Sequence, residues 1–136
     1  MKTGAVQKLK VVGDHPRHYW LAQDDRRGRE RARLLKRDLA QKFQVGDTLD
    51  VFVYTDKKGF LLASVDVPEI DLQTIKKLRV KKVVAAGAFL EWGLNKDLFW
   101  PKSEQRYPVK EGRSYPVVLF TDKSGQLLAS ENNYPH

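Results

Sequence analysis

Two stretches of the sequence are nearly the same: residues 55–64 read TDKKGFLLAS and residues 121–130 read TDKSGQLLAS. The match continues upstream without a gap, so that residues 36–64 align with residues 102–130 at an offset of 66, with 11 identical pairs. A repeat that occurs in both halves of a chain indicates two similar small domains. We therefore expect three parts: a first domain at 1–68, a linker at 69–78 and a second domain at 79–136.

Each copy of the repeat has the pattern of short β-strands. Alternate residues of the segment 49–54 are aliphatic, and the Asp-Lys-X-Gly sequence that follows is typical of the tight turn of a β-hairpin. Further β-rich runs precede the hairpins, at 6–12, 19–23 and 32–35 and again at 79–85, 89–92 and 98–100. Five short strands in about 60 residues fit an OB barrel. The sequence thus predicts an all-β fold, with two tandem five-stranded OB-fold barrels joined by a short linker.

The segment 29–43 has a second interpretation, because its apolar residues also recur at the spacing of an amphipathic helix. The aligned segment of the second copy contains Pro101 and Pro108, which the interior of a continuous helix does not tolerate. We therefore expect a strand that is followed by a short turn or helix at 36–40.

The composition excludes several classes of protein. The chain has 136 residues, no cysteine and a formal net charge of +8. Without cysteine it has no disulfide framework and no thiolate chemistry, and we expect it in the cytoplasm. No apolar stretch approaches the roughly 18 residues of a membrane helix, so we expect no membrane partner. The positive charge, +5 up to Pro68 and +3 after it, favours polyanions as partners.

Catalytic motifs are missing from the sequence. His15 and His18 flank Pro16 in an expected loop, but no Cys or carboxylate cluster with the spacing of metal ligands accompanies them, so we interpret both as surface residues. Asp56 and Asp122 occupy matching turn positions. The sequence contains no glycine-rich phosphate loop and no nucleophile elbow. We expect a protein that is not an enzyme and holds no cofactor or metal.

The second copy resembles a known RNA-binding module. The segments GAFLEWG at 87–93 and KDLFWPKSE at 96–104, followed by Gly112 and the hairpin at 122–130, resemble the OB module named after ribosomal protein S-one. The tandem is similar to the first two such modules of the conserved virulence factor B family, also called YitL-like proteins. In that family the third strand runs through a Pro and then Ser-Glu-Gln, as at 101–105 here.

The resemblance implies that single-stranded RNA binds on the barrel face built by the second and third strands, with aromatic rings stacking on bases and basic residues holding phosphates. Phe89 matches the outward aromatic residue of the second strand, and Trp20 is its counterpart. Three positions depart from the module: Ala86 replaces an aromatic residue, Pro101 a histidine and Gln126 a basic residue. These departures favour an alternative, a protein-interaction module on the ribosome or RNA polymerase. Binding of single-stranded DNA by the same face is a third interpretation.

Basic residues cluster at 26–37 and at 76–82. If the segment 29–35 is extended, every second side chain lies on one face at a spacing of about 7 Å, similar to the phosphate spacing of a stretched single strand. The alternative for each cluster is a charged edge strand that resists pairing with other chains.

Aromatic side chains among basic residues are suited to single-strand binding, because every base has a face that can stack. Tyr19 and Trp20 cannot both face outward, and we favour Trp20; Tyr54 is a further candidate, and Trp92 is assigned to the core. The expected nucleic-acid-binding residues are Trp20, Arg29, Arg31, Arg33, Lys36, Arg37, Lys81, Phe89, Trp100 and Lys102.

Overall fold

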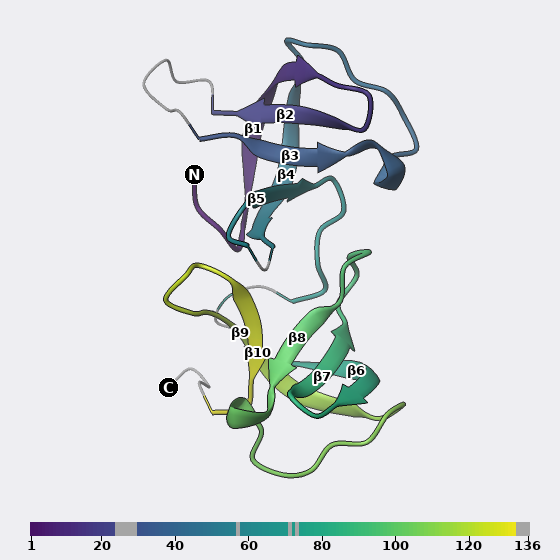
Figure 1. The fold of residues 1–136 in the computed structure, drawn as a ribbon, viewed down its shortest axis with the longest axis vertical. Helices are drawn as coiled ribbons and strands as arrows, with labels where there is room; N and C mark the ends of the chain where they lie inside the picture. Colours follow the sequence, from purple (N-terminus) through teal and green to yellow (C-terminus); the bar gives the residue numbers. More distant parts are fainter. Residues whose placement is uncertain (24–29, 57, 71, 73, 133–136) are drawn as a thin grey trace. The chain divides into compact units, whose positions relative to one another are not determined.

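The computed structural model describes residues 1–23, 30–56, 58–70, 72 and 74–132. The chain divides into two compact units, Met1–Val67 and Pro68–His136. Figure 1 shows the first unit in purple to teal and the second in green to yellow, each built from strands that coil around their own core. The predicted all-β architecture of two five-stranded OB-type barrels is confirmed.

The first unit is a closed barrel with the strand order β1-β2-β3-β5-β4. Strands β3 and β5 pair in parallel and the other neighbours pair antiparallel. The short 3-10 helix η1 (Lys36–Asp38) follows β3, which confirms the expected strand and short helical turn. The five strands are β1 (Ala5–Asp14), β2 (His18–Ala22), β3 (Ala32–Leu35), β4 (Thr48–Thr55) and β5 (Leu61–Ser64).

The core of the first barrel follows from the period of two in its strands, which places every second side chain inside. Burial of these apolar side chains is the main favourable contribution to folding, and the barrel leaves the intervening side chains on its outer face. The buried cluster consists of Leu9, Val11, Tyr19, Leu21, Ala32, Leu34, Val51, Val53 and Ala63.

The second unit repeats this arrangement as a sheet with the strand order β10-β9-β6-β7-β8. The 3-10 helix η2 (Lys102–Glu104) follows β8, and its Glu104 connects to the strand at the far end of the order. The Glu104 carboxylate accepts a hydrogen bond from the Ser130 hydroxyl, at 2.6 Å, and its carbonyl accepts one from the Glu131 N–H, at 2.9 Å. The strands are β6 (Lys76–Val84), β7 (Gly87–Glu91), β8 (Leu98–Pro101), β9 (Ser114–Thr121) and β10 (Leu127–Ser130).

The expected linker at 69–78 differs from the structure. Ile70 is buried, Leu72 forms an isolated bridge to Leu119 of β9, and β6 already begins at Lys76. The division between the units lies after Val67. The burial of Ile70 is expected for an apolar side chain, because its exposure to water is unfavourable.

The repeated hairpin turns have one geometry. The Asp122 carboxylate accepts hydrogen bonds from the backbone N–H of Ser124 and of Gln126, and Asp56 accepts the matching pair in the first barrel. Gly59 and Gly125 have φ angles of 85° and 87°, which favour glycine. The turn needs both the aspartate and the glycine, which explains why the Asp-Lys-X-Gly sequence occurs in both units.

The first strands of the two barrels share an irregularity. The register shifts between Val11 and Gly13 in β1 and between Val80 and Lys82 in β6. At each shift the carbonyl accepts a hydrogen bond from a glycine N–H, Gly46 to Val11 at 2.9 Å and Gly112 to Val80 at 2.8 Å.

No helix in the described part of the chain is long and apolar enough to cross a membrane.

Candidate nucleic-acid interface

The outer face of β2 and β3 carries an indole with a guanidinium above it. Trp20 and Arg33 are directly opposite each other in the antiparallel register. The Cζ atom of Arg33 lies 5.1 Å from the centroid of the Trp20 ring, which is the geometry of a cation–π contact. Both side chains are half-buried, and their neighbours along the strands, Tyr19 and Leu34, point into the core. The choice of Trp20 over Tyr19 as the outward residue is confirmed.

Two histidines extend this cluster along the face. The His18 ring meets the edge of the Trp20 ring at a centroid distance of 4.9 Å, and the His15 ring stacks on His18 at 5.1 Å. His18 is the first residue of β2 and is half-buried, so its placement in a surface loop was wrong. Desolvation lowers the pKa of His18, and the charges of Arg33, His15 and Lys36 lower it further.

A glycine makes room for the indole. Gly13 of β1 is the residue opposite Trp20 on its other side. A Cβ atom at this position would lie 3.3 Å from Cδ1 of Trp20, which is closer than most such contacts. The β-bulge beside Gly13 also turns this part of β1, since bulges increase the local twist of a strand. The sequence of β1 therefore sets where the Trp20 ring can lie.

The second barrel has two phenyl rings at the corresponding place. Phe89 of β7 lies opposite Phe99 of β8, with ring centroids 5.2 Å apart and planes inclined by 49°. Lys82 of β6 is opposite Phe89 and is exposed. A Cβ atom at Gly87 would lie 3.0 Å from Cζ of Phe99 and 2.2 Å from the Trp100 carbonyl oxygen, so only glycine fits beside this ring.

Trp100 does not belong to this interface. Its side chain is 0% exposed, and its Nε1 donates a hydrogen bond to the Glu104 carbonyl at 3.0 Å. A base cannot stack on a ring that is enclosed in the core, so the inclusion of Trp100 among the binding residues was wrong. Tyr54 is also buried, and burial raises its pKa to about 12. The assignment of Trp92 to the core is confirmed.

Two further basic candidates of the first barrel, Arg31 and Arg37, lie on either side of β3 in the sequence. Arg31 is exposed and alternates with Arg33 across the buried Ala32, as the period of two predicts. Arg37 is exposed, with its Nε 3.9 Å from an Asp38 carboxylate oxygen. Arg29 lies outside the described residues. The structure thus brings Arg33 to Trp20, whereas Arg31 and Arg37 are exposed residues before and after β3.

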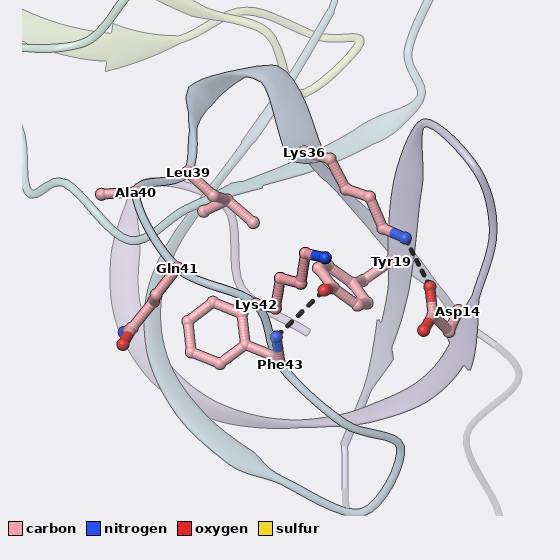
Figure 2. Close-up of a pocket in the computed structure, with 8 residues that line it drawn as sticks. All are labelled: Asp14, Tyr19, Lys36, Leu39, Ala40, Gln41, Lys42 and Phe43. Carbon is pink, nitrogen blue, oxygen red and sulfur yellow. Dashed lines mark hydrogen bonds and ion pairs between the residues drawn. The ribbon is translucent and has the colours of Figure 1, made fainter.

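Lys36 borders a groove at the end of the first barrel. The groove has a volume of about 420 Å³. Figure 2 shows the Lys36 amine directed at Asp14, with which it forms an ion pair, and the Tyr19 hydroxyl accepting a hydrogen bond from the Phe43 N–H. The Lys36 Nζ also lies 4.6 Å from the centroid of the Tyr19 ring. These contacts engage Lys36 before any ligand arrives. The groove is lined by Asp14, Tyr19, Lys36, Leu39, Ala40, Gln41, Lys42 and Phe43.

The basic candidates of the second barrel are exposed. Lys81 forms an ion pair of 3.4 Å with Asp97, whereas Lys102 lies in η2, directly after the β8 strand that carries Phe99. In the described part of the chain, no three His, Cys, Asp or Glu side chains are grouped so that they could hold a metal ion. The chemistry that the two faces offer is therefore stacking and positive charge.

Sequence reasoning missed Phe99 and the position of His18 beside Trp20, and it included Lys82 only as a member of the basic cluster at 76–82. The signal for Phe99 was present, because the offset of 66 aligns Phe99 with Arg33, which was already expected to face outward. In the segment Leu98–Pro101 both central residues are aromatic, so aromatic character alone does not distinguish the outward ring from the buried one. The register of β8 with β7 distinguishes them, because Phe99 lies opposite the half-buried Phe89 and Trp100 opposite the buried Ala88.

Comparison with known proteins agrees with the fold of both units. The model of the S1 domain matches residues 3–66 and again residues 74–132. A protein named Conserved virulence factor B from Staphylococcus epidermidis is 29% identical over 138 residues, which cover 94% of this chain and 45% of the relative. Its namesake from Staphylococcus saprophyticus is 26% identical over 133 residues, 93% of this chain and 43% of the relative. The chain spans less than half the length of these relatives.

A solved structure has the same fold. It is described as a multidomain protein with nucleic acid binding domains from Streptococcus pneumoniae, and it matches with a TM-score of 0.74 and 21% identity over 93% of this chain and 45% of that one. The resemblance to conserved virulence factor B proteins is confirmed by the relatives of that name. Because the two matched regions cover most of the sequence, this chain belongs to the S1 domain family and contains two such domains in tandem.

Proposed function

We propose that this chain is a non-catalytic, cytoplasmic RNA-binding protein that holds single-stranded RNA and acts in post-transcriptional regulation. The observation that carries the proposal is the pair of half-buried ring clusters, Trp20 with Arg33 and Phe89 with Phe99, at matching places on the two barrels. Membership of the S1 domain family supports a nucleic-acid-binding role, as does the name of the matching structure.

The physical basis is the combination of stacking and charge. A base that stacks on an exposed aromatic ring contributes about 1–3 kcal/mol, whatever its identity. Lysine and arginine side chains around the rings attract the phosphate backbone and release its counterions. The net charge of +8 gives the whole chain a favourable long-range interaction with a polyanion. We therefore expect RNA binding with little sequence preference.

Fluorescence anisotropy with a labelled single-stranded RNA of mixed sequence tests the proposal. We expect binding at low salt. In a plot of the logarithm of the association constant against the logarithm of the salt concentration, each neutralised phosphate should contribute about −0.7 to the slope. A duplex of the same RNA should bind more weakly, because its bases are not available for stacking. Absence of binding to the single strand at low salt would refute the proposal, and tighter binding of the matched DNA strand would redirect it to single-stranded DNA.

A protein-interaction role, on the ribosome or RNA polymerase, is the second candidate. It is favoured by apolar side chains that are exposed away from the ring clusters, above all Phe60 at 58% and Tyr107 at 73%. Affinity capture from a lysate treated with nuclease separates the two roles. Ribosomal or polymerase subunits that remain after RNA digestion, and that the Phe60→Ser variant loses, would support the interaction role.

A further inference from the structure

The two ring clusters differ in what covers them. In the first barrel the guanidinium of Arg33 lies over the Trp20 ring itself, and His18 contacts the edge of the same ring. A base approaching Trp20 therefore meets a cation as well as an aromatic face. In the second barrel the Phe89 ring has another hydrocarbon ring, Phe99, as its partner, and the phenyl groups carry no charge.

Among the residues that the structure describes, the cation of the first cluster has no carboxylate partner. No carboxylate among the described residues lies within ion-pair distance of Arg33. The Nε atom of Arg33 and the Nε2 atom of the neighbouring His18 are buried and have no hydrogen-bond partner among the described residues. A half-buried guanidinium with no counter-charge among the described residues gains from an arriving phosphate, since charge-assisted hydrogen bonds are about twice as strong as neutral ones.

The cations beside the second cluster are largely compensated. Arg79 donates to Glu91 at 3.1 Å, and Lys81 pairs with Asp97 at 3.4 Å. Lys82, opposite Phe89, is exposed and is the basic residue nearest in register to the two phenyl rings. An exposed lysine on a flexible stem gives less energy to a phosphate than a guanidinium that is held against a ring.

We propose that the two barrels bind RNA by different contacts: the Trp20–Arg33–His18 cluster is a phosphate-directed site, whereas the Phe89–Phe99 pair is a base-stacking site. This inference rests on the proposed function and adds a division of the binding energy between the domains. The first barrel then gives most of the salt dependence, and the second barrel gives most of the contribution that remains at high salt.

Two single substitutions in the full chain separate the contacts. Arg33→Gln removes the cation above the indole, and Phe99→Leu removes one ring of the pair while keeping an apolar side chain. Matched controls are exposed side chains outside both ring clusters: Lys58→Gln removes an exposed charge and Val45→Ala an exposed apolar side chain. If circular dichroism shows that Phe99→Leu impairs folding, Phe89→Leu replaces it as the variant of the stacking site.

The first measurement uses fluorescence anisotropy to determine how the binding of a single-stranded oligouridine depends on salt concentration. For Arg33→Gln we expect the log–log salt slope to fall by about 0.7, the contribution of one phosphate. For Phe99→Leu we expect an unchanged slope and a loss of affinity of about tenfold at every salt concentration. Both control variants should keep the slope and affinity of the wild type to within about twofold, because exposed side chains away from a site have small effects.

Inorganic polyphosphate, which has a charged chain and no bases, is the second probe. As a competitor of the RNA it should lose potency with Arg33→Gln and keep it with Phe99→Leu. Equal slopes and equal competition for these two variants would overturn the division between the barrels while leaving RNA binding intact. A wild-type chain that binds neither probe would overturn both the division and the proposed function.

Discussion

Trp100 of β8 lies directly opposite Ala88 of β7, whereas in the first barrel Tyr19 of β2 lies opposite Leu34 of β3. All four side chains are buried. Each barrel thus places one large ring and one smaller side chain at this cross-strand position, but the ring comes from opposite strands. Because protein interiors are packed to nearly constant density, the exchange fills the same space with different residues.

Because Trp100 fills the core at this position, its truncation should strongly reduce the stability of the second barrel. Trp100→Ala should reduce the free energy of unfolding of the second barrel by roughly 3–5 kcal/mol, because it leaves a cavity beside Ala88 that no neighbour fills. Urea denaturation followed by circular dichroism measures the change. Trp20→Ala is the matched control and should cost far less, since its ring is half-buried on the outer face. Similar losses for the two tryptophans would contradict the assignment of Trp100 to the core.

A second prediction concerns the glycines beside the two outward rings. Gly87→Ala should destabilise the second barrel by about 1–3 kcal/mol, because the new Cβ would lie 2.2 Å from the Trp100 carbonyl oxygen and the backbone has to move. Gly13→Ala should be better tolerated, since its closest contact is with the Trp20 side chain at 3.3 Å. Thermal unfolding compares the two variants. Equal melting temperatures for both would show that the close approach at Gly87 is relieved at no cost.

The fold could be predicted largely from one local feature. The hairpin repeat predicts where Asp56 and Asp122 accept backbone hydrogen bonds, and its glycines have the positive φ that the turn needs. The extent of the linker could not be predicted in the same way. Ile70 is buried and Leu72 forms a bridge to Leu119, and because the segment has no alternation, no local pattern predicts either contact.

The candidate site could be predicted only in part. The resemblance to the S-one module predicts Phe89 as an outward residue and Trp20 as its counterpart, and both are half-buried on the outer face. The error at Trp100 has a physical reason: adjacent residues of a strand face opposite sides, so a shift of one position exchanges Phe99 with Trp100. Aromatic residues are suited to either side, and only the pairing register assigns them.

A third prediction tests the hairpin turn. Asp122→Ala should reduce the free energy of unfolding by about 1 kcal/mol or more, because the N–H groups of Ser124 and Gln126 lose their acceptor. The hydrogen bond from the Ser124 side chain is the largest cause of the lowered pKa of Asp122, and backbone hydrogen bonds add to it. A carboxyl group with a lowered pKa in the folded state stabilises the fold above its unfolded value of 3.8, and this contribution is lost as the pH falls further.

Urea midpoints of the wild type and of Asp122→Ala, measured at neutral pH and at acid pH, check this prediction. The difference between the two proteins should shrink in acid, where Asp122 of the wild type is protonated. Asp56→Ala is the corresponding variant of the first barrel and reports whether its turn behaves alike. A difference for Asp122→Ala that stays constant with pH would mean that the carboxylate charge does not stabilise the turn.

The last prediction concerns His18, whose pKa is lowered in the folded protein by desolvation, Arg33, His15 and Lys36. Because the unfolded chain binds this proton first, stability should decline as the pH falls through the ordinary value of 6.5 toward the lowered one. A phosphate bound at Arg33 stabilises the protonated imidazole, so RNA affinity should rise over the same range. NMR titration of the His18 ring with and without RNA should show a higher pKa in the complex. His18→Asn should reduce both pH dependences, and an RNA affinity that changes with pH equally in this variant would exclude His18 as the group responsible.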